Sequence, residues 1–462
     1  MGDPQCQGCR ELSKRVGELE AVVKELQARL GLHSGNSSLP PSKNPPQAAK
    51  PVVKTPTGRK PGGQPGHQPC ARVRLPRERL KEVVAFVPKV CAGCTAALPA
   101  EAGPADPEPT WHQVAELPSM LAEVVEYQGH GRQCQHCGTL TWERIPAEIR
   151  AHAFGPRLTA TVSYLSGSPH VSKRGIEELV ETLVGIPIAL GTVVNLEQEM
   201  SKALTAAHQE AQEAVCQAAV KNVDETGWKQ AGKGCWLWAA ATSAVAYFVI
   251  HPKRGAAGLK ALLGEHIKGI IGSDRWAVYG RLQTHLRQIC WAHLKRDFQK
   301  LVDRGPPAKE IGEQCLAIAG LVFDVWHTYR GGGISRRQMQ KEMAEWRDAL
   351  RDELEQGCAC ADAKAAALCR NLLAIEPALW TFVSTPNVEP TNNHIERILR
   401  SAVLWRKNAF GCHSANGCRF VERILTAVQT LRLQNKPVLE FLHQTLVASR
   451  NQQSAPKLVP CG

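Results

Sequence analysis

Three acidic residues in short motifs could together hold divalent metal ions. Asp224 lies in the sequence NVDETGW and Asp274 in GSDRW, each at the end of an apolar run typical of a β-strand. Glu396 lies far downstream in TNNHIER, within a basic helical stretch. Three carboxylates brought together from such distant positions can bind two metal ions, which is what in-line displacement at a phosphodiester needs. Taken singly, each residue is more often structural, and only their order, strand context and basic flanks together favour catalysis.

From residue 219 onward the sequence predicts strands. Residues 220–229 are the first of them. Residues 234–250 carry no charge and approach membrane-spanning length, but Thr242 and Ser243 divide them into two strand-length halves that are rich in β-forming residues. A buried hairpin is therefore favoured over a membrane span, and no membrane partner is expected.

Residues 267–273 predict a fourth strand that ends at Asp274, and residues 288–300 pass from a short strand into a helix. A mixed sheet with one Asp on strand one, another on strand four and a Glu on a later helix is RNase H-like, because strands one and four are neighbours there. Without metal, three clustered carboxylates would repel one another. The predicted fold class is therefore an α/β catalytic core of RNase H-like type within residues 219–436, with a helical insertion at about 306–386.

Basic side chains gather around Glu396, and a basic wall beside a metal site suits a phosphate backbone. Trp405 and Phe410 could stack on a flipped or terminal base, or pack in the core. His293 could contact phosphate, assist proton transfer or pack between helices. The candidate DNA contacts in this part of the chain are His293, Arg296, Arg397, Arg400, Arg406 and Lys407.

The chain as a whole is basic. It has 462 residues, with 56 Lys and Arg against 43 Asp and Glu, a net charge of +13. Such a length exceeds one compact core, so several domains are expected. The charge suits nucleic acid, although an unspecific basic surface is an alternative. Seventeen cysteines without an export signal indicate the cytoplasm, where a DNA-binding protein would associate with the DNA of the cell.

The N-terminal segments predict a helix and a linker. Residues 1–33 contain apolar side chains at 3-4 spacing, which indicates a zipper-like helix. This helix either dimerises, giving a homodimer or higher oligomer on DNA, or packs on its own body. Residues 34–76 have no Asp or Glu, ten Pro and seven Lys or Arg, which is typical of an extended segment. Arg59 and Lys60 in this segment could follow a DNA backbone, or the segment could be a plain linker.

Two Cys-x-x-Cys pairs within residues 77–150 predict a structural zinc site. Each such turn presents two thiolates, and two turns supply the four ligands of a tetrahedral ion. The alternative is that the thiols are paired in sequence only. A third pair near the N-terminus has no obvious partner pair. The predicted ligands of this zinc-ribbon-like module are Cys91, Cys94, Cys134 and Cys137.

Residues 151–218 predict helices. Ser172 could cap one helix that Gly185 ends, and Thr192 could cap a second, longer helix. Two helices joined by a short turn in a basic protein could be a helix-turn-helix DNA-binding region or a connecting helical hairpin. Residues 437–462 predict a C-terminal helix and tail.

Taken together, these motifs resemble the DDE transposases of bacterial insertion sequences, specifically the insertion-sequence-66 family. The resemblance runs nearly end to end. Cys412 and His413 depart from it, because small polar residues are more usual there, and the N-terminal cysteine pair is not part of the pattern. The segments that carry the resemblance are 36–42 (NSSLPPS), 59–67 (RKPGGQPGH), the two later cysteine pairs, 223–228 (VDETGW), 273–275 (SDR), 290–294 (CWAHL), 296–298 (RDF), 392–397 (NNHIER) and 405–411 (WRKNAFG).

The resemblance implies DNA cleavage and strand transfer at the terminal inverted repeats of an insertion sequence. It implies that Asp224, Asp274 and Glu396 hold two Mg²⁺ or Mn²⁺ ions, and that target DNA and accessory proteins of the same element are partners. Two alternatives remain. A DNA-binding regulator derived from a transposase would lack the chemistry, and the intact triad argues against it. A nuclease of the same fold would hydrolyse DNA without joining ends.

Overall fold

The computed structural model describes residues 15, 18, 74–101, 103–104, 106–117 and 120–459. Apart from positions 15 and 18, these residues form two compact units, within 74–121 and 122–459, and each unit is described by itself. The predicted zipper-like helix lies outside the described residues, except for positions 15 and 18. Most of the predicted linker also lies outside them, including Arg59 and Lys60.

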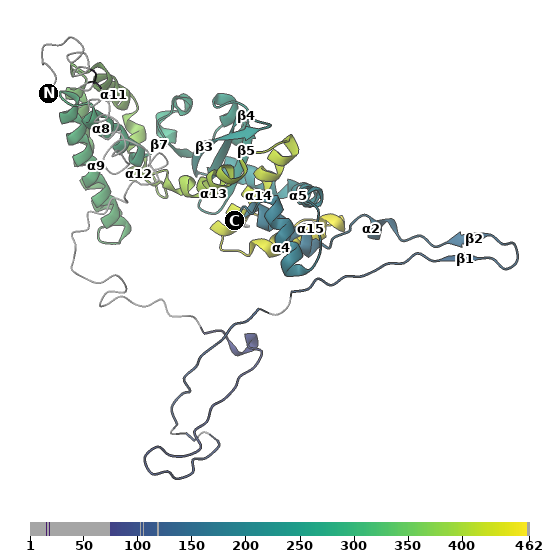
Figure 1. The fold of residues 1–462 in the computed structure, drawn as a ribbon. Coiled ribbons are helices and arrows are strands. Elements are labelled where there is room, and N and C mark those ends of the chain that lie inside the picture. Colours follow the sequence, from purple (N-terminus) through teal and green to yellow (C-terminus); the bar gives the residue numbers. More distant parts are fainter. Residues whose placement is uncertain are drawn as a thin grey trace, which may run out of the picture. The chain divides into compact units, whose positions relative to one another are not determined.

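A five-stranded mixed sheet forms the centre of the larger unit (Figure 1). Its strands are β3 (Val220–Gln230), β4 (Lys233–Ala241), β5 (Ala246–His251), β6 (Ile270–Ser273) and β7 (Arg287–Ile289). The spatial order is β5-β4-β3-β6-β7. Strands β3, β4 and β5 pair antiparallel, whereas β3, β6 and β7 run parallel, with helix α7 (Ala256–Leu263) between β5 and β6. This arrangement confirms the predicted α/β core with a mixed sheet.

The hairpin predicted from the uncharged segment is present as β4 and β5. Thr242 begins the turn, where its Oγ1 accepts a hydrogen bond from the backbone N–H of Val245 at 3.0 Å. Trp238 and Phe248 are fully buried in the two strands. In the part of the chain that the structure describes, no helix is long and apolar enough to cross a membrane.

Two helices pack on the sheet, one against its central strand β3 and the other against its edge strand β5. Helix α13 (Asn393–Ala409) lies against β3, and helix α14 (Ala415–Leu433) lies against β5 (Figure 1). Three side chains of α14, one turn apart, accept hydrogen bonds from the outward backbone N–H groups of β5. Thr430 bonds Ala246 at 3.0 Å, Thr426 bonds Phe248 at 3.1 Å, and Glu422 bonds Ile250 at 2.6 Å.

The predicted helical segment after β7 is present and has its own hydrophobic core. Ser335 and Gln338 form a reciprocal capping box that fixes the start of one helix, and Asp362 caps the start of another. Apolar side chains such as Trp326 and Met343 pack between the helices. The helices are α8 (Trp291–Asp303), α9 (Ala308–Arg330), α10 (Arg336–Gly357), α11 (Ala363–Ala374) and α12 (Thr381–Ser384).

Among the described residues, four helices of 12 to 14 residues precede the sheet, and one further helix follows α14. They are α3 (Pro156–Gly167), α4 (Lys173–Val184), α5 (Leu190–Ala203), α6 (Thr205–Gln217) and the C-terminal α15 (Val438–Arg450). Ser172 caps α4 and Gly185 ends it with φ 75°, as predicted. The predicted cap at Thr192 is wrong. Helix α5 already begins at Leu190, because the carbonyl of Ala189 accepts the N–H of Thr192 at 2.8 Å and so starts the first turn.

Residues 122–150 and the smaller unit contain little regular structure. The first contain the short antiparallel pair β1 (Gly131–Gln133) and β2 (Leu140–Trp142), followed by α2 (Ala147–Arg150). The described part of the smaller unit contains a 3-10 turn at Arg77–Arg79 and an isolated bridge between Val90 and Ala97.

Candidate active site

The two predicted catalytic aspartates belong to neighbouring parallel segments of the chain, with Asp224 on β3 and Asp274 directly after β6. Pairing of β3 with β6 runs from Val220 opposite Ile270 to Asn222 opposite Gly272. Continued at the same offset, it places Asp224 level with Asp274, the residue directly after β6. The alternation of side chains along a strand then sends both carboxylates to the same face.

Glu396 reaches this face from the first turn of α13. The residue that holds this turn in place is Asn392, which is 1% exposed. Its Nδ2 donates to the carbonyl of Val223 at 2.8 Å, and its Oδ1 accepts from Asn222 Nδ2 at 2.8 Å. Its backbone N–H also donates to Cys290 Sγ at 3.1 Å. The sequence shows Asn392 within the TNNHIER motif but predicts no role for it.

Asp274 and Glu396 lie close enough to Asp224 to affect its ionisation. Burial raises the pKa of Asp224 well above its usual range, and the negative charges of Glu225, Glu396 and Asp274 raise it further. A hydrogen bond from the N–H of Glu225 to Asp224 Oδ1, at 2.9 Å, partly offsets these effects. A buried carboxyl beside two other carboxylates resists ionisation until a cation is present.

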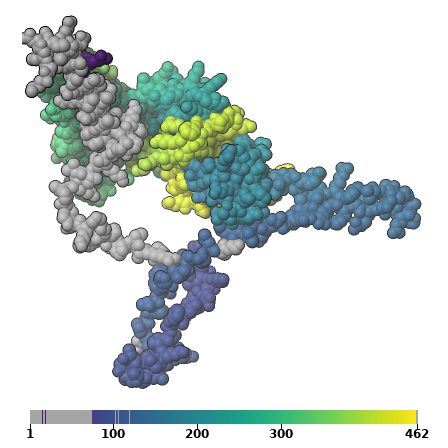
Figure 2. Space-filling view, viewed as in Figure 1, coloured from purple at the N-terminus to yellow at the C-terminus, as the bar shows by residue number. Residues whose placement is uncertain are grey.

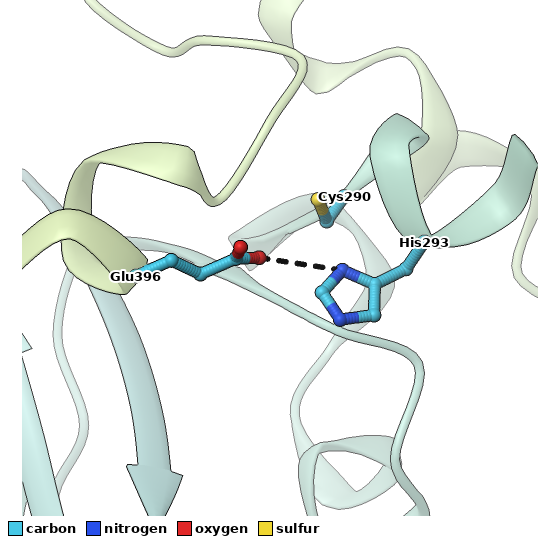
Figure 3. A group of neighbouring side chains, drawn as sticks. All are labelled: Cys290, His293 and Glu396. Carbon is cyan, nitrogen blue, oxygen red and sulfur yellow. Dashed lines mark ion pairs between the residues drawn. The ribbon is translucent and has the colours of Figure 1, made fainter. Parts of the chain in front are cut away.

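Cys290, His293 and Glu396 form a second cluster at the same place (Figure 3). The ligand atoms of these three residues all lie within 4.8 Å of one another. Among the described residues, no other group of three or more His, Cys, Asp or Glu side chains is this close. His293 Nδ1 lies 3.6 Å from Glu396 Oε1. Both of these atoms are buried without a hydrogen-bond partner. Sequence reasoning missed Cys290 as a potential ligand, although its spacing to His293 puts both at the start of α8.

The protonation of this cluster follows from its burial. Burial raises the pKa of the Cys290 thiol to about 11. Burial, followed by the nearby Arg296, lowers the pKa of His293, and these effects exceed the opposing attraction of Glu396. We therefore expect a neutral imidazole at pH 7, able to accept a proton or to bind a metal through a ring nitrogen.

A polar cluster around the buried side chain of Glu225 supports β3 from its opposite face. Glu225 accepts hydrogen bonds from Arg254 Nη2 at 2.7 Å and from the hydroxyl of Tyr279 at 2.8 Å. The Arg254 guanidinium lies over the rings of Trp236 and Trp276, at 4.6 and 4.2 Å from their centroids. The contacts fix the segment that follows Asp274. The sequence does contain a signal for this second cluster. Asp224 and Glu225 are adjacent on one strand, so their side chains must lie on opposite faces of the sheet.

The predicted DNA contacts of the core differ in their surroundings. Arg397, Arg400 and Lys407 are exposed on α13, and Arg296 is half-buried on α8. Arg406 is engaged within the protein, because its Nη1 donates to Thr226 Oγ1 at 2.9 Å and to the carbonyl of Gly227.

The two cysteine pairs form turns of the same type. The carbonyl of Cys91 accepts the N–H of Thr95 at 2.9 Å, and that of Cys134 accepts the N–H of Gly138 at 2.9 Å. Hydrogen bonds lower the pKa of Cys91, chiefly the backbone N–H of Cys94, and that of Cys137, chiefly the Thr139 hydroxyl. The first turn belongs to the smaller unit and the second to the larger one, so a four-cysteine zinc site remains a prediction.

Comparison with known proteins identifies a family and one curated relative. Residues 152–419 match the family described as "Transposase IS66 family". This stretch covers more than half of the chain and includes all three carboxylates. A protein of Sinorhizobium fredii, named "Uncharacterized protein y4qI", is 27% identical over 234 residues, which are 46% of this chain and 43% of the relative. The match thus spans less than half of the relative's length.

Proposed function

Because this chain belongs to the IS66 family of transposases, we propose that it cleaves and joins DNA at the terminal inverted repeats of an insertion sequence. Asp224, Asp274 and Glu396 are the proposed catalytic triad. The strand order, in which β3 with Asp224 is the parallel neighbour of β6 with Asp274 directly after it, supports an RNase H-like catalytic core.

The pairing of β3 with β6 carries this proposal. Continued by two residues, it would bring Asp224 on β3 level with Asp274 just after β6, two acids from separate motifs. The two hydrogen bonds between Asn392 and β3 bring the first turn of α13, and with it Glu396, to the same place. If these acids were merely structural, nothing would require a buried asparagine to join the helix of Glu396 to the strand of Asp224.

The donor set suits divalent metal ions. Mg²⁺ and Mn²⁺ prefer carboxylate oxygens, and the mutual repulsion of three carboxylates calls for cations. The buried and unpartnered Oε1 of Glu396 is one orphaned ligand atom, and Nδ1 of His293 is another. When bound, two such ions would activate the attacking water or 3′-hydroxyl and stabilise the leaving oxygen.

The residues of the chain have separable roles in this proposal. Asp224 and Asp274 supply carboxylates from the rigid sheet, and Asn392 orients Glu396. His293, whose Nδ1 lies 3.6 Å from Glu396 Oε1, would receive a proton near the reacting phosphate. The exposed Arg397, Arg400 and Lys407 would bind the DNA backbone.

Other segments of the chain would bind DNA, hold zinc or join protomers. Helices α3–α6 would form the DNA-binding region at 151–218, the two cysteine turns would hold a structural Zn²⁺ in the 77–150 module, and the N-terminal helix would join protomers. Inverted-repeat ends, target DNA and accessory proteins of the same element are the proposed partners.

The test is strand transfer with the purified protein and the end sequences of its element. The wild type should join a 3′-end to target DNA only with Mg²⁺ or Mn²⁺, and Asp224→Asn should abolish joining while DNA affinity stays within about twofold. Asp352→Asn, at an exposed position of α10, is the matched control. Full strand transfer by Asp224→Asn would overturn the triad. Hydrolysis without joining by the wild type would indicate a nuclease instead.

A further inference from the structure

The exposed side of α13 connects the proposed catalytic carboxylate with an aromatic side chain. Arg400 and Lys407 follow Glu396 at positions that share its helix face, and both are exposed. The helix ends at Phe410, which is 77% exposed. In the space-filling view, yellow-green atoms of residues around 390–420 form part of the surface (Figure 2).

Phe410 is not the core residue that its size suggests. Trp405, one turn earlier, is buried, and it stacks on His170 with ring centroids 4.8 Å apart. Phe410 instead adopts the left-handed conformation with φ 58°, which bulky side chains rarely do. Its N–H donates to the carbonyl of Arg406 at 2.8 Å, and the ring turns away from the core into solvent.

The backbone around Phe410 is fixed to the sheet. Cys412 donates its N–H to the carbonyl of Lys229 at 2.8 Å and accepts the N–H of Ala231 at 2.8 Å. Gly411, with φ 112°, lies so close to β3 that a Cβ there would be 2.2 Å from the carbonyl oxygen of Lys229. The aromatic ring is therefore presented from a rigid strap rather than from a free loop.

We propose that Phe410 is a stacking platform for an unpaired DNA base, with Arg400 and Lys407 holding the strand that runs from this base to the catalytic carboxylates. This inference rests on the proposed function. An exposed ring beside cationic side chains matches a nucleobase next to its phosphates, because any base can stack on an aromatic face while Lys and Arg bind the backbone.

The geometry also gives the position of this base. Fourteen residues of helix between Glu396 and Phe410 extend about 21 Å. At about 3.4 Å per nucleotide of one strand, that is roughly six nucleotides. The unpaired base should thus lie on the order of six nucleotides from the phosphate at the catalytic carboxylates.

The experiment compares two duplexes in the absence of divalent metal, so that no cleavage occurs. One contains a single unpaired 2-aminopurine and the other is fully paired. Phe410→Ala should weaken binding of the first roughly 5- to 150-fold, the range of one aromatic–base stack, and change binding of the second by less than about twofold. The fluorescence of 2-aminopurine should be quenched by the wild type and not by this variant.

Two further variants complete the test. Phe410→Trp should restore both affinity and quenching, because it keeps a stacking ring. Leu404→Ala is the matched control, since Leu404 is 47% exposed on the same helix and is not aromatic. Unchanged binding by Phe410→Ala, or an equal loss on both duplexes, would overturn the inference. A wild type that binds neither duplex would overturn the proposed function, and this inference with it.

Discussion

The side-chain oxygen of Asn392 accepts a hydrogen bond from the side-chain amide of Asn222 at 2.8 Å. Asn392 precedes α13 and Asn222 lies on β3, so this bond joins the helix that carries Glu396 to the strand that carries Asp224. The relationship gives the first prediction.

Replacing Asn392 with Ala should lower the free energy of unfolding by roughly 2–4 kcal/mol, because the carbonyl of Val223 and the amide of Asn222 lose buried partners. Strand transfer should fall by more than about tenfold, since Glu396 loses its anchor. Urea unfolding and the joining assay measure the two effects. The exposed Asn393, the next residue, is the matched control. Equal stability of the Asn392→Ala and Asn393→Ala variants would contradict this role.

His208 should make the protein lose stability in mild acid. Burial lowers the pKa of His208 to about 4, and its Nε2 lies 3.0 Å from the carbonyl of Phe248. Below pH 6.5 the unfolded chain gains a proton that the folded protein excludes, so stability present above pH 6.5 is lost as the pH falls towards 4. The loss should be on the order of 3 kcal/mol.

His208→Gln should flatten this pH dependence, because glutamine does not titrate. Urea unfolding at several pH values between 7.5 and about 4.5 measures the difference between the two proteins. The exposed His266→Gln is the control and should keep the slope of the wild type. A parallel loss of stability in all three proteins would assign the acid sensitivity to other groups.

Removing two neighbouring cationic side chains of α13, Arg406 and Lys407, should affect stability and DNA binding differently. Lys407→Ala should leave stability unchanged but weaken DNA binding, and should reduce the slope of log affinity against log salt by about one. Arg406→Ala should lower the free energy of unfolding by about 1–3 kcal/mol, because its bonds to Thr226 and Gly227 are lost. Salt-dependent binding and urea unfolding separate these effects. The reverse pattern would exchange the two roles.

The purified protein should contain about one equivalent of zinc. Changing Cys91 and Cys134 to Ser together should remove it, because each turn loses one thiolate. Elemental analysis after dialysis measures the metal content. Changing the buried Cys315 to Ser is the control and should leave the zinc in place. Zinc retained in the double variant would place the metal elsewhere in the chain.

The sequence was sufficient to predict the sheet, because its strands are marked by strong local patterns. The division of the uncharged segment at Thr242 and the strand ending before Asp274 are both confirmed. The capping side chain of Ser172 and the glycine at 185 also defined α4 correctly.

Long-range contacts were not predictable in the same way. Nothing local indicated that Asn392 would bond two residues of β3, or that Cys290 and His293 would meet Glu396. Phe410 shows the same limit, since its exposure depends on the contact of Cys412 with Lys229 and not on its own hydrophobicity. Thr192 was misassigned as a cap because the chain becomes helical earlier than its side-chain pattern suggests.

The ladder of α14 side chains along β5 protects one edge of the sheet. An unpaired edge strand is a template for another strand, and through it proteins aggregate or exchange segments. Here the N–H groups of Ala246, Phe248 and Ile250 are already bonded to Thr430, Thr426 and Glu422. The β5 edge is therefore closed to strand addition, and any second chain that meets this edge would contact side chains of α14 rather than extend the sheet there.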